Sequence, residues 1–402
     1  MFFLPALRKD QPTCRRPATR RACGPIFSSL SEHTMEGPYS ARFPSSPAGE
    51  KSRRAPVLRG TAEDRTRLCR LVRPWKERAM DAQPDREFAH RPVMADEIVA
   101  LFAPVPAGWF IDATLGGAGH ASLLLEAHPH LKVLGLDQDP DALVAAQSRL
   151  ERFGDRARTA RTRFDSLASV VARTVPDDES VVGALFDLGV SSPQLDRAER
   201  GFSYRLDAPL DMRMNPAQAL SATTVVNEYD EAALTKVLRD NGDEKFAGRI
   251  TKAIVAQRPV ATTGELAEIV RNAIPAPARR RGGHPAKRTF QAIRIEVNDE
   301  LGVLPVALEA ALDALCVGGR IAVLSYHSGE DRIVKQVLRT AETGGCTCPT
   351  NFPCVCGAIQ RVRLLSRGGR TPGADELVVN PRAESARLRS AECISLLPGR
   401  SR

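Results

Sequence analysis

The sequence predicts an α/β fold built on a mostly parallel, Rossmann-like sheet, for two reasons. First, the apolar run 109–111 reads as a buried strand, and the glycine-rich stretch 112–120 follows it and leads into a helix. Second, another apolar run, 133–136, ends in Asp137, 18 residues beyond Gly119. A strand, a glycine-rich turn, a helix and a second strand that ends in an acid are typical of nucleotide-cofactor binding. The alternative is an ordinary turn between two buried strands.

Taken in order, the chain alternates between apolar runs and segments with helical spacing. Helices are expected at 95–102, from His120 to residue 127, and at 141–153, where Asp139 and Pro140 form a good helix start. Parallel strands end at one edge of a sheet, and ligands bind outside that edge, so the residues after each strand are the candidates for a site. The predicted strands are 109–111, 133–136, 158–163 and 181–187.

Residues 201–300 interrupt this alternation. An irregular loop comes first, and helices are expected at 222–228, 231–240, 244–257, 263–273 and 289–300. The alternation resumes with a helix at 300–315, a strand at 318–327 and a helix at 328–340; the last strands are expected at 359–365 and 376–379, and 382–391 is a basic closing segment. The predicted organisation is a core in two parts, 86–200 and 301–394, around the helical insertion 201–300.

The chain's net charge of +9 comes from its amino-terminal extension. Residues 1–80 hold 17 Lys and Arg against 7 Asp and Glu, so the rest of the chain is close to neutral, and the overall charge does not indicate a nucleic-acid-binding core. The extension is rich in Arg, Pro and Ser without periodicity, which predicts disorder for residues 1–85, and 395–402 is expected to be a disordered tail. Met35 and Met80 are alternative starts, so the extension is either a start-site artefact or a functional basic arm.

No apolar run is long enough to cross a membrane, and the apolar start of the chain lacks the flanks of a secretory signal. The nine cysteines have no secretory context and are expected to be reduced thiols in a cytoplasm. Four of them, Cys346, Cys348, Cys354 and Cys356, lie within eleven residues. They could hold a tetrahedral zinc, but the Cys-x-Cys spacing is tighter than in common zinc knuckles. No metal ligand is therefore assigned, and free thiols or redox pairing are the alternatives.

The glycine-rich stretch also indicates which cofactor it would bind. Gly116, Gly117 and Gly119 do not fit the G-x-G-x-x-G pattern of dinucleotide sites. Asp112 stands at the end of the first strand, where it would repel a pyrophosphate but attract a cation. S-adenosylmethionine carries a sulfonium and an ammonium group, so this acid favours S-adenosylmethionine over NAD. Asp137 suits the two hydroxyls of its ribose.

Aromatic and imidazole side chains lie close to these strand ends in the sequence. Phe164, followed by Asp165, could stack on adenine while the acid accepts from the adenine amino group; a plain core phenylalanine is the alternative. His120 directly follows the glycine-rich loop and is expected to contact the cofactor rather than act as a general base. His327 has no recognisable partner in the sequence.

The stretch from Asp187 to Gln194 indicates methylation of an exocyclic base amine. The lone pair of such an amine is delocalised into the ring, so acceptors that grip its N–H bonds would aim the lone pair at the methyl group. Asp187 and Ser191 supply such acceptors and are the candidate catalytic residues, unless the turn is purely structural. It resembles the Asp/Ser-Pro-Pro-Tyr turn of amino-group methyltransferases, except that Gln194 replaces the aromatic residue, so base stacking would come from Phe202 or Tyr204. No cysteine stands here, as ring-carbon methylation would need.

The segment 278–294 carries six Lys and Arg and no acid. Glycines inside such a basic run suit contacts with the phosphates of RNA, made from a loop that leads into a helix start. The alternative is a solvated charged loop with no ligand.

Several long motifs together resemble one family, the bacterial 16S ribosomal RNA cytosine-N(4) methyltransferases, over roughly residues 88–394. The motifs are His90-Arg-Pro-Val, Asp112-Ala-Thr-Leu-Gly-Gly-Ala-Gly-His, Leu136-Asp-Gln-Asp-Pro, Phe186-Asp-Leu-Gly-Val-Ser-Ser-Pro-Gln-Leu-Asp, Arg200-Gly-Phe-Ser-Tyr, Leu210-Asp-Met-Arg-Met, Arg288-Thr-Phe-Gln-Ala-Ile-Arg-Ile, Ser325-Tyr-His-Ser and Asn380-Pro-Arg.

This resemblance implies a class I methyltransferase fold with an inserted helical RNA-recognition domain. It implies S-adenosylmethionine as donor, a cytidine of the decoding centre as acceptor, and 16S ribosomal RNA in the small ribosomal subunit as partner. A cytoplasmic enzyme is expected, with no membrane or DNA involved and with homodimer formation left open. The cofactor contacts carried over motif by motif are Ala118, Gly119, His120, Asp137, Phe164, Asp187 and Gln194. A small-molecule methyltransferase and a non-catalytic ribosome-assembly factor are the alternatives.

Overall fold

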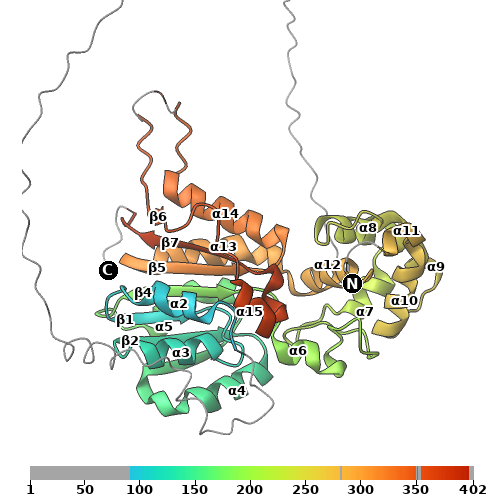
Figure 1. Cartoon of the computed structure of the whole chain (residues 1–402), viewed down its shortest axis with the longest axis horizontal. Coiled ribbons are helices and arrows are strands. Elements are labelled where there is room, and N and C mark those ends of the chain that lie inside the picture. Colours follow the sequence, from blue (N-terminus) through green and yellow to red (C-terminus); the bar gives the residue numbers. More distant parts are fainter. Residues whose placement is uncertain (1–90, 281–282, 350, 352–354, 398–402) are drawn as a thin grey trace, which may run out of the picture. The chain divides into compact units, whose positions relative to one another are not determined.

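The computed structural model describes residues 91–397 except 281–282, 350, 352–354 and the side chain of Ser192. The predicted extension 1–85 and the alternative starts Met35 and Met80 lie outside the described residues. Figure 1 shows a sheet covered by helices on both faces and a group of helices, α7 to α12, beside the ends of its strands. Within the described residues, no helix is long and apolar enough to span a membrane.

Seven strands form one sheet in the order β3-β2-β1-β4-β5-β7-β6. Strands β1 to β5 are parallel, whereas β7 runs antiparallel to both β5 and β6. This confirms the predicted α/β class with a mostly parallel sheet. The apolar composition of β4 matches its burial along nearly its whole length, as expected for a central parallel strand. The bounds are β1 Gly108–Asp112, β2 Leu131–Asp137, β3 Ala157–Arg161, β4 Val181–Asp187, β5 Leu315–Ser325, β6 Val362–Leu364 and β7 Arg387–Cys393.

Each face of the sheet is covered by three main helices. The first face packs against α2 (Ala95–Phe102), α3 (Gly119–Ala127) and α4 (Pro140–Leu150), in a core that includes Phe102 and Phe110. The second face packs against α5 (Leu167–Thr174), α13 (Glu300–Ala314) and α14 (Ser328–Thr343). Short segments connect these layers: η2 Glu151–Arg156, η3 Phe164–Ser166, α6 Ser192–Asp196, η4 Ala198–Arg200, α15 Ala374–Val379 and η5 Pro381–Ser385.

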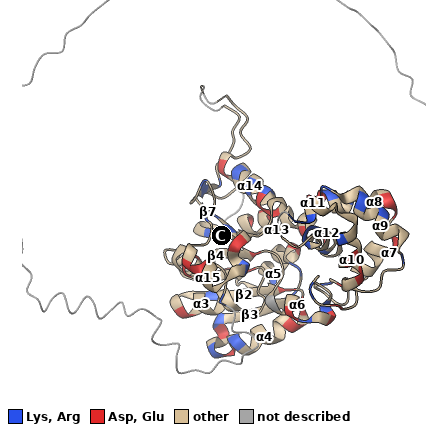
Figure 2. Cartoon of the chain, turned by 45° about the vertical axis from the view of Figure 1, so that its right-hand side comes forward, with Lys and Arg blue, Asp and Glu red and all other residues tan. Residues whose placement is uncertain are grey.

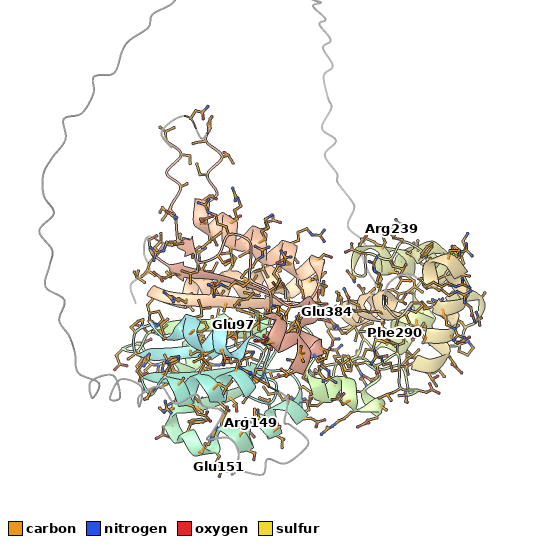
Figure 3. All side chains as sticks on the ribbon, in the orientation of Figure 1. Glu97, Arg149, Glu151, Arg239, Phe290 and Glu384 are labelled. Carbon is orange, nitrogen blue, oxygen red and sulfur yellow. The ribbon has the colours of Figure 1, made fainter. Side chains whose placement is uncertain are left out.

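Between β4 and β5, the helices α7 to α12 pack around a hydrophobic cluster of their own. Phe290 of α12 lies in this cluster (Figure 3). Ser221, Asp230 and Thr262 accept hydrogen bonds from the first turns of α7, α8 and α10, and these local caps explain why the three predicted helices match the observed bounds. The helices are α7 Ala222–Glu228, α8 Glu231–Asp240, α9 Ala247–Ala256, α10 Thr263–Ala273, α11 Ala276–Arg279 and α12 Lys287–Asn298.

The carboxyl-terminal part of the fold differs from the prediction. Residues 376–379 form the end of helix α15, not a strand. In this helix, the Glu376 carboxylate accepts a hydrogen bond of 2.7 Å from the backbone N–H of Met94, which lies 282 residues earlier in the chain. The basic closing segment instead supplies the antiparallel strand β7, which pairs with β5 from Ser325↔Arg387 to Arg320↔Glu392. The valines of α15 favour a strand locally, so the tertiary contact overrides the local preference.

Candidate active site

A cavity of about 1040 Å³ lies at the edge of the sheet where the parallel strands end. Its walls come from the segments after β1, β2, β3, β4 and β5 and from α12 of the insertion. Ala118 does not line it: this residue is fully buried, and its N–H donates to Leu115 O at 2.8 Å, so it supports the loop from behind. The other residues predicted to contact cofactor or substrate all line the cavity: Gly119, His120, Asp137, Phe164, Asp187, Ser191 and Gln194.

The glycine-rich loop between β1 and α3 has the tight shape that its composition predicts. Gly116 and Ala118 both adopt positive φ values, of 50° and 58°, and Ala118 is the residue that caps α3. A side chain at Gly119 would come within 2.7 Å of Pro92, so only a glycine lets the start of α3 pack against the segment before α2. The loop is thus held close to the sheet edge, with the N-terminus of a helix facing the cavity.

Three carboxylates gather at this edge: Asp112 at the end of β1, Asp137 at the end of β2 and Asp187 at the end of β4. Burial raises the pKa of Asp112 from 3.8 to about 7, and repulsion from the other two adds to the rise while His120 opposes it. Burial likewise raises the pKa of Asp137 to about 6. A positively charged ligand between them would favour the ionised forms, so this part of the cavity suits a cation.

Asp137 already holds two backbone groups. Its Oδ2 accepts the N–H of Gly116 at 2.8 Å, and its Oδ1 accepts the N–H of Asp139 at 2.8 Å. It therefore links the glycine-rich loop to the end of β2. Each carboxylate oxygen has a second lone pair, so ribose hydroxyls could still bind there, and the ribose contact stays a prediction.

Asp187 is oriented by residues from two other strands. The hydroxyl of Tyr326, directly after β5, donates to Asp187 Oδ1 at 2.6 Å, and the Asp187 N–H donates to Thr114 Oγ1 at 2.6 Å. Burial and the negative charge of Asp187 raise the pKa of Tyr326 well above its usual value, so Tyr326 stays a donor. Sequence reasoning assigned Tyr326 no role; its only signal was its place after a strand in the Ser325-Tyr-His-Ser motif.

The two histidines of the cavity differ in their contacts. His120 is buried, its Nε2 lies 3.5 Å from Asp187 Oδ2, and neither ring nitrogen has a hydrogen-bond partner among the described residues. His327 caps α14 and lies 3.1 Å from Glu330, which also accepts the N–H of Tyr326. His327 thus has the partner that the sequence did not reveal, whereas His120 points its ring at the acid of β4 and stays available to a ligand.

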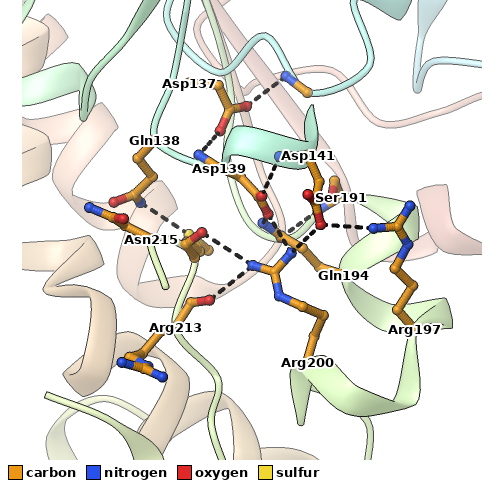
Figure 4. A network of polar contacts seen from close by, with 12 residues as sticks. Asp137, Gln138, Asp139, Asp141, Ser191, Gln194, Arg197, Arg200, Arg213 and Asn215 are labelled. Carbon is orange, nitrogen blue, oxygen red and sulfur yellow. Dashed lines mark hydrogen bonds and ion pairs between the residues drawn. The ribbon is translucent and has the colours of Figure 1, made fainter. Parts of the chain in front are cut away.

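Gln194 is engaged at both ends of its amide. Its Oε1 accepts the N–H of Ser191 at 3.1 Å, and its Nε2 donates to Asp139 at 2.9 Å. Arg200 completes this buried network with an ion pair of 2.8 Å to Asp139 (Figure 4). Gln194 therefore fixes the turn after β4 against the start of α4, and its predicted contact with the cofactor stays untested. Asp139 was recognisable as a helix cap, but its tie to Arg200 was not.

Aromatic side chains form another part of the wall. Phe164 lies edge-on to Phe186, with ring centroids 6.0 Å apart, and lines the cavity just after β3. Phe202 and Tyr204 line it on the side of the insertion, where Tyr204 stacks on His284 with centroids 4.5 Å apart. The cavity thus has flat apolar surfaces at two places, as stacking of an adenine and a second base would require.

Charged residues close the cavity beside α12. Arg294 makes two hydrogen bonds to Glu300, of 2.8 and 2.9 Å, and both side chains are nearly buried. Burial raises the pKa of Glu300, an effect that Arg294 opposes. Arg294 belongs to the basic run 278–294, but this contact makes it a structural residue rather than a free phosphate ligand.

The rest of that basic run divides between a short helix, a turn and the first turn of α12. Arg280, Lys287 and Arg288 are exposed, and Lys287 lines the cavity, while Arg281 lies outside the described residues. Figure 2 shows Lys and Arg on α8, α11 and α12, with acidic residues among them. Lys287 therefore places an exposed cation at the insertion's side of the cavity, where a polyanion could reach it.

Comparisons with known proteins match nearly all of the described chain. The MraW methylase family model matches residues 87–394. The ribosomal RNA small subunit methyltransferase H of Heliobacterium modesticaldum is 50% identical over 312 residues, which are 76% of this chain and 99% of that protein. The protein of the same name from Thermobifida fusca is 51% identical over 311 residues, 76% of this chain and 93% of that one.

A third relative of that name, from Mycobacterium tuberculosis, is 46% identical over 377 residues, 90% of this chain and 94% of that one. This share is larger than residues 87–402 make up, so the alignment includes part of the amino-terminal extension. With a family model that covers the whole cavity and relatives at about half identity, the chain belongs to the MraW methylase family, as a class I methyltransferase that uses S-adenosylmethionine.

Proposed function

We propose that this enzyme transfers a methyl group from S-adenosylmethionine to the 4-amino group of a cytidine in the decoding centre of 16S ribosomal RNA, within the small ribosomal subunit. The observation that carries the proposal is the Asp187 carboxylate, which Tyr326 orients at the cavity edge beside the turn of Ser191. The printed names of the relatives support ribosomal RNA as substrate. A ribosomal substrate also implies that the enzyme acts in the cytoplasm.

The donor would occupy the carboxylate-lined half of the cavity. Its sulfonium would lie near Asp112 and Asp187, where burial of acids makes a positive charge favourable. Phe164 would contact the adenine, and Asp137 would accept from the ribose. The start of α3, with Gly119 and His120, would face the charged amino acid end of the donor.

The side chains at the strand ends determine how the cytosine amine, the methyl acceptor, would be oriented. Asp187 and the Ser191 segment would accept the N–H bonds of the cytosine amine and turn its lone pair toward the methyl group. After transfer, the positively charged product nitrogen loses a proton, for which Asp187 is the nearest acceptor that Tyr326 holds in place. Among the described residues that line the cavity, none is a cysteine, as attack on a pyrimidine ring carbon would need.

The insertion would hold the surrounding RNA. A base inside a duplex cannot reach a methyl donor at the bottom of a cavity, so the cytidine must be unstacked or flipped. Tyr204 and Phe202 lie on the insertion's side of the cavity and would receive the flipped base. Arg280, Lys287 and Arg288 are exposed nearby and would contact the flanking phosphates.

The deciding experiment is mass spectrometry of nucleosides from 16S ribosomal RNA of cells with and without this protein, combined with methylation of purified small subunits in vitro. The proposal expects a 4-methylated cytidine that disappears with the gene and is restored by purified enzyme. A methyl group on ring carbon five would contradict it. Methylation of a small metabolite but not of RNA would favour the small-molecule alternative, and tight subunit binding without transfer would favour an assembly factor.

A further inference from the structure

A segment outside the catalytic cavity brings several cysteines together. Between α14 and β6 the chain leaves the body of the enzyme and returns to it (Figure 1). The sulfur atoms of Cys346, Cys348 and Cys356 all lie within 4.8 Å of one another. In a tetrahedral zinc site with the usual Zn–S distance, the sulfur atoms lie about 3.8 Å from one another. The distances between these three sulfurs would therefore shorten by at most about 1 Å on zinc binding. None of them lines the catalytic cavity.

The base of this segment is fixed by backbone contacts. Arg361 donates its N–H to Ala341 O at 2.9 Å, and a side chain at Gly344 would come within 2.5 Å of the backbone of Ile359. Arg361 also pairs with Glu309 and Asp313 of α13, at 2.9 and 2.6 Å. The two ends of the segment are therefore anchored side by side.

The described part of the loop has no apolar core to hold it. Val355 is 89% exposed and Ile359 is 37% exposed, whereas Cys346 and Cys348 are half-buried on either side of exposed Thr347. Residues two apart in an extended chain point to the same side, which lets both thiols face inward despite the short Cys-x-Cys spacing. With its valine exposed and three sulfurs close together, the loop has the pattern of a segment held by a metal rather than by hydrophobic packing.

Glycines stand where the loop must turn around the sulfurs. Gly344 and Gly345, just before Cys346, have φ values of 63° and 74°, and Gly357, just after Cys356, has a φ of 70°. These left-handed conformations favour glycine, and the open space around Gly345 and Gly357 shows that conformation rather than crowding requires it. Cys346 and Cys356 are thus each next to a left-handed turn of the backbone.

We propose that Cys346, Cys348 and Cys356 bind a structural zinc ion that cross-links the loop between α14 and β6. Thiolate ligands select zinc over the hard cations that prefer oxygen. The fourth cysteine of the sequence cluster, Cys354, lies outside the described residues, and the proposal rests on the other three. Because the sulfurs are away from the catalytic cavity, the ion holds the loop in shape and takes no part in methyl transfer.

Metal analysis of the full chain, expressed in zinc-supplemented medium and purified without chelator, tests this proposal. About one zinc per chain is expected in the wild type and in the Cys316→Ser control, which removes a cysteine of β5 outside the cluster. The Cys346→Ser/Cys348→Ser double variant should lose nearly all of the zinc. The zinc-depleted loop should be cut faster by a broad-specificity protease, while methyl transfer stays within about twofold of the wild type.

Measurements on the wild type keep the test independent of how the variant folds. A mercurial that modifies thiols should release the zinc, and cobalt substitution should give the intense visible absorption of a tetrahedral thiolate site. The proposal fails if the wild type carries no zinc, carries iron instead, or loses zinc equally in the Cys316→Ser control. A mass decrease of 2 Da that maps to a disulfide within 346–356 would show redox pairing in its place.

Discussion

The two halves of the cavity contrast in how their charges are satisfied. On the sheet side, Asp112 and Asp137 carry raised pKa values, and His120 has no hydrogen-bond partner among the described residues. On the insertion side, Arg294 and Glu300 form a buried two-point ion pair with each other. The sheet side is thus electrostatically incomplete without a ligand, whereas on the insertion side the buried charges are paired with each other and aromatic faces are presented.

This contrast indicates which half of the cavity gains more electrostatic stabilisation when its ligand binds. Acids with raised pKa values store an unfavourable interaction that a cation would relieve, so cofactor binding should be strongly coupled to their ionisation. A neutral base needs stacking and a few hydrogen bonds, which do not require charges to be left unsatisfied. Substitutions on the two sides should therefore fail in different ways: loss of turnover or cofactor affinity on the sheet side, and loss of stability or RNA affinity on the insertion side.

The largest effect is expected for Asp187→Ala. Removing the acceptor of the amine protons should lower kcat by about 10²- to 10⁴-fold, while the fold is retained. Single-turnover methylation of small subunits measures this loss. Tyr326→Phe, which removes only the hydrogen bond that orients Asp187, should cost about tenfold less than the loss of the acid itself. Turnover of the Asp187 variant within tenfold of the wild type would exclude it as the catalytic acceptor.

Arg294→Ala should destabilise the insertion side of the cavity, because it removes one partner of the buried ion pair. The variant leaves the Glu300 carboxylate buried without its partner, so the free energy of unfolding should fall by about 3 to 5 kcal/mol in urea titrations. The matched control is the double variant Arg294→Met/Glu300→Leu, which removes both charges and should recover most of that loss. Equal stability of the single and double variants would show that the pair contributes little.

Asp137→Ala should weaken the donor's binding on the incomplete side. The loss of charged hydrogen bonds to ribose, worth about 1.5 to 3 kcal/mol, should reduce affinity for S-adenosylmethionine by about tenfold to a hundredfold in calorimetry. The Asp137 carboxylate also holds the N–H of Gly116, so Asp137→Asn serves as a milder control that keeps an acceptor oxygen. Unchanged affinity in both variants would remove Asp137 from the site.

The raised pKa values predict a pH dependence of cofactor affinity. From pH 5.5 to 7.5, Asp137 and then Asp112 lose their protons as the pH passes about 6 and about 7, and a cation binds better to the ionised forms. Affinity for S-adenosylmethionine should therefore rise by about tenfold across this range. S-adenosylhomocysteine, which lacks the sulfonium charge, should show a smaller rise, and Asp112→Asn should flatten the curve for both. Equal pH dependence of the two ligands would contradict a role for the sulfonium.

Protein stability without ligand should respond to pH in the opposite sense. Both carboxyls bind a proton more tightly in the folded chain than in the unfolded chain, where the pKa is 3.8. Their contribution to stability is therefore largest at low pH and is lost as the pH rises through about 6 and 7. Thermal unfolding of Asp112→Asn against the wild type, at pH 5.5 and 7.5, isolates this contribution.

The smallest effect is expected for charge reversal on the exposed surface of the insertion. Arg280→Glu and Arg288→Glu should each weaken RNA binding by several-fold. They should also make binding less dependent on salt: the slope of log K against log salt concentration should become shallower by about one unit for each phosphate that the variant no longer neutralises. Arg339→Glu, on the exposed side of α14, is the control that leaves the insertion unchanged. An equal weakening in the control would show that overall charge, and not this surface, governs binding.

The local features of the chain could be predicted from the sequence. The glycine-rich loop, β4 and the bounds of α7, α8 and α10 follow from apolar spacing, glycines and capping residues, all of which act over a few positions. Asp137 and Asp187 were found for the same reason, because an acid directly after a buried strand reaches the sheet edge. His327 could have been found as well, since Glu330 follows it three residues later, as in a capping box.

Only the tertiary structure decided the contacts between distant segments. Tyr326 and Asp187 are 139 residues apart, and their contact depends on β4 and β5 lying side by side across the whole insertion. The same holds for Glu376, whose bond to Met94 accompanies a helix where the valines favour a strand. Spacing and propensity describe neighbours along the chain, whereas which strand ends meet is set by the packing of the whole sheet, and that packing completes the site.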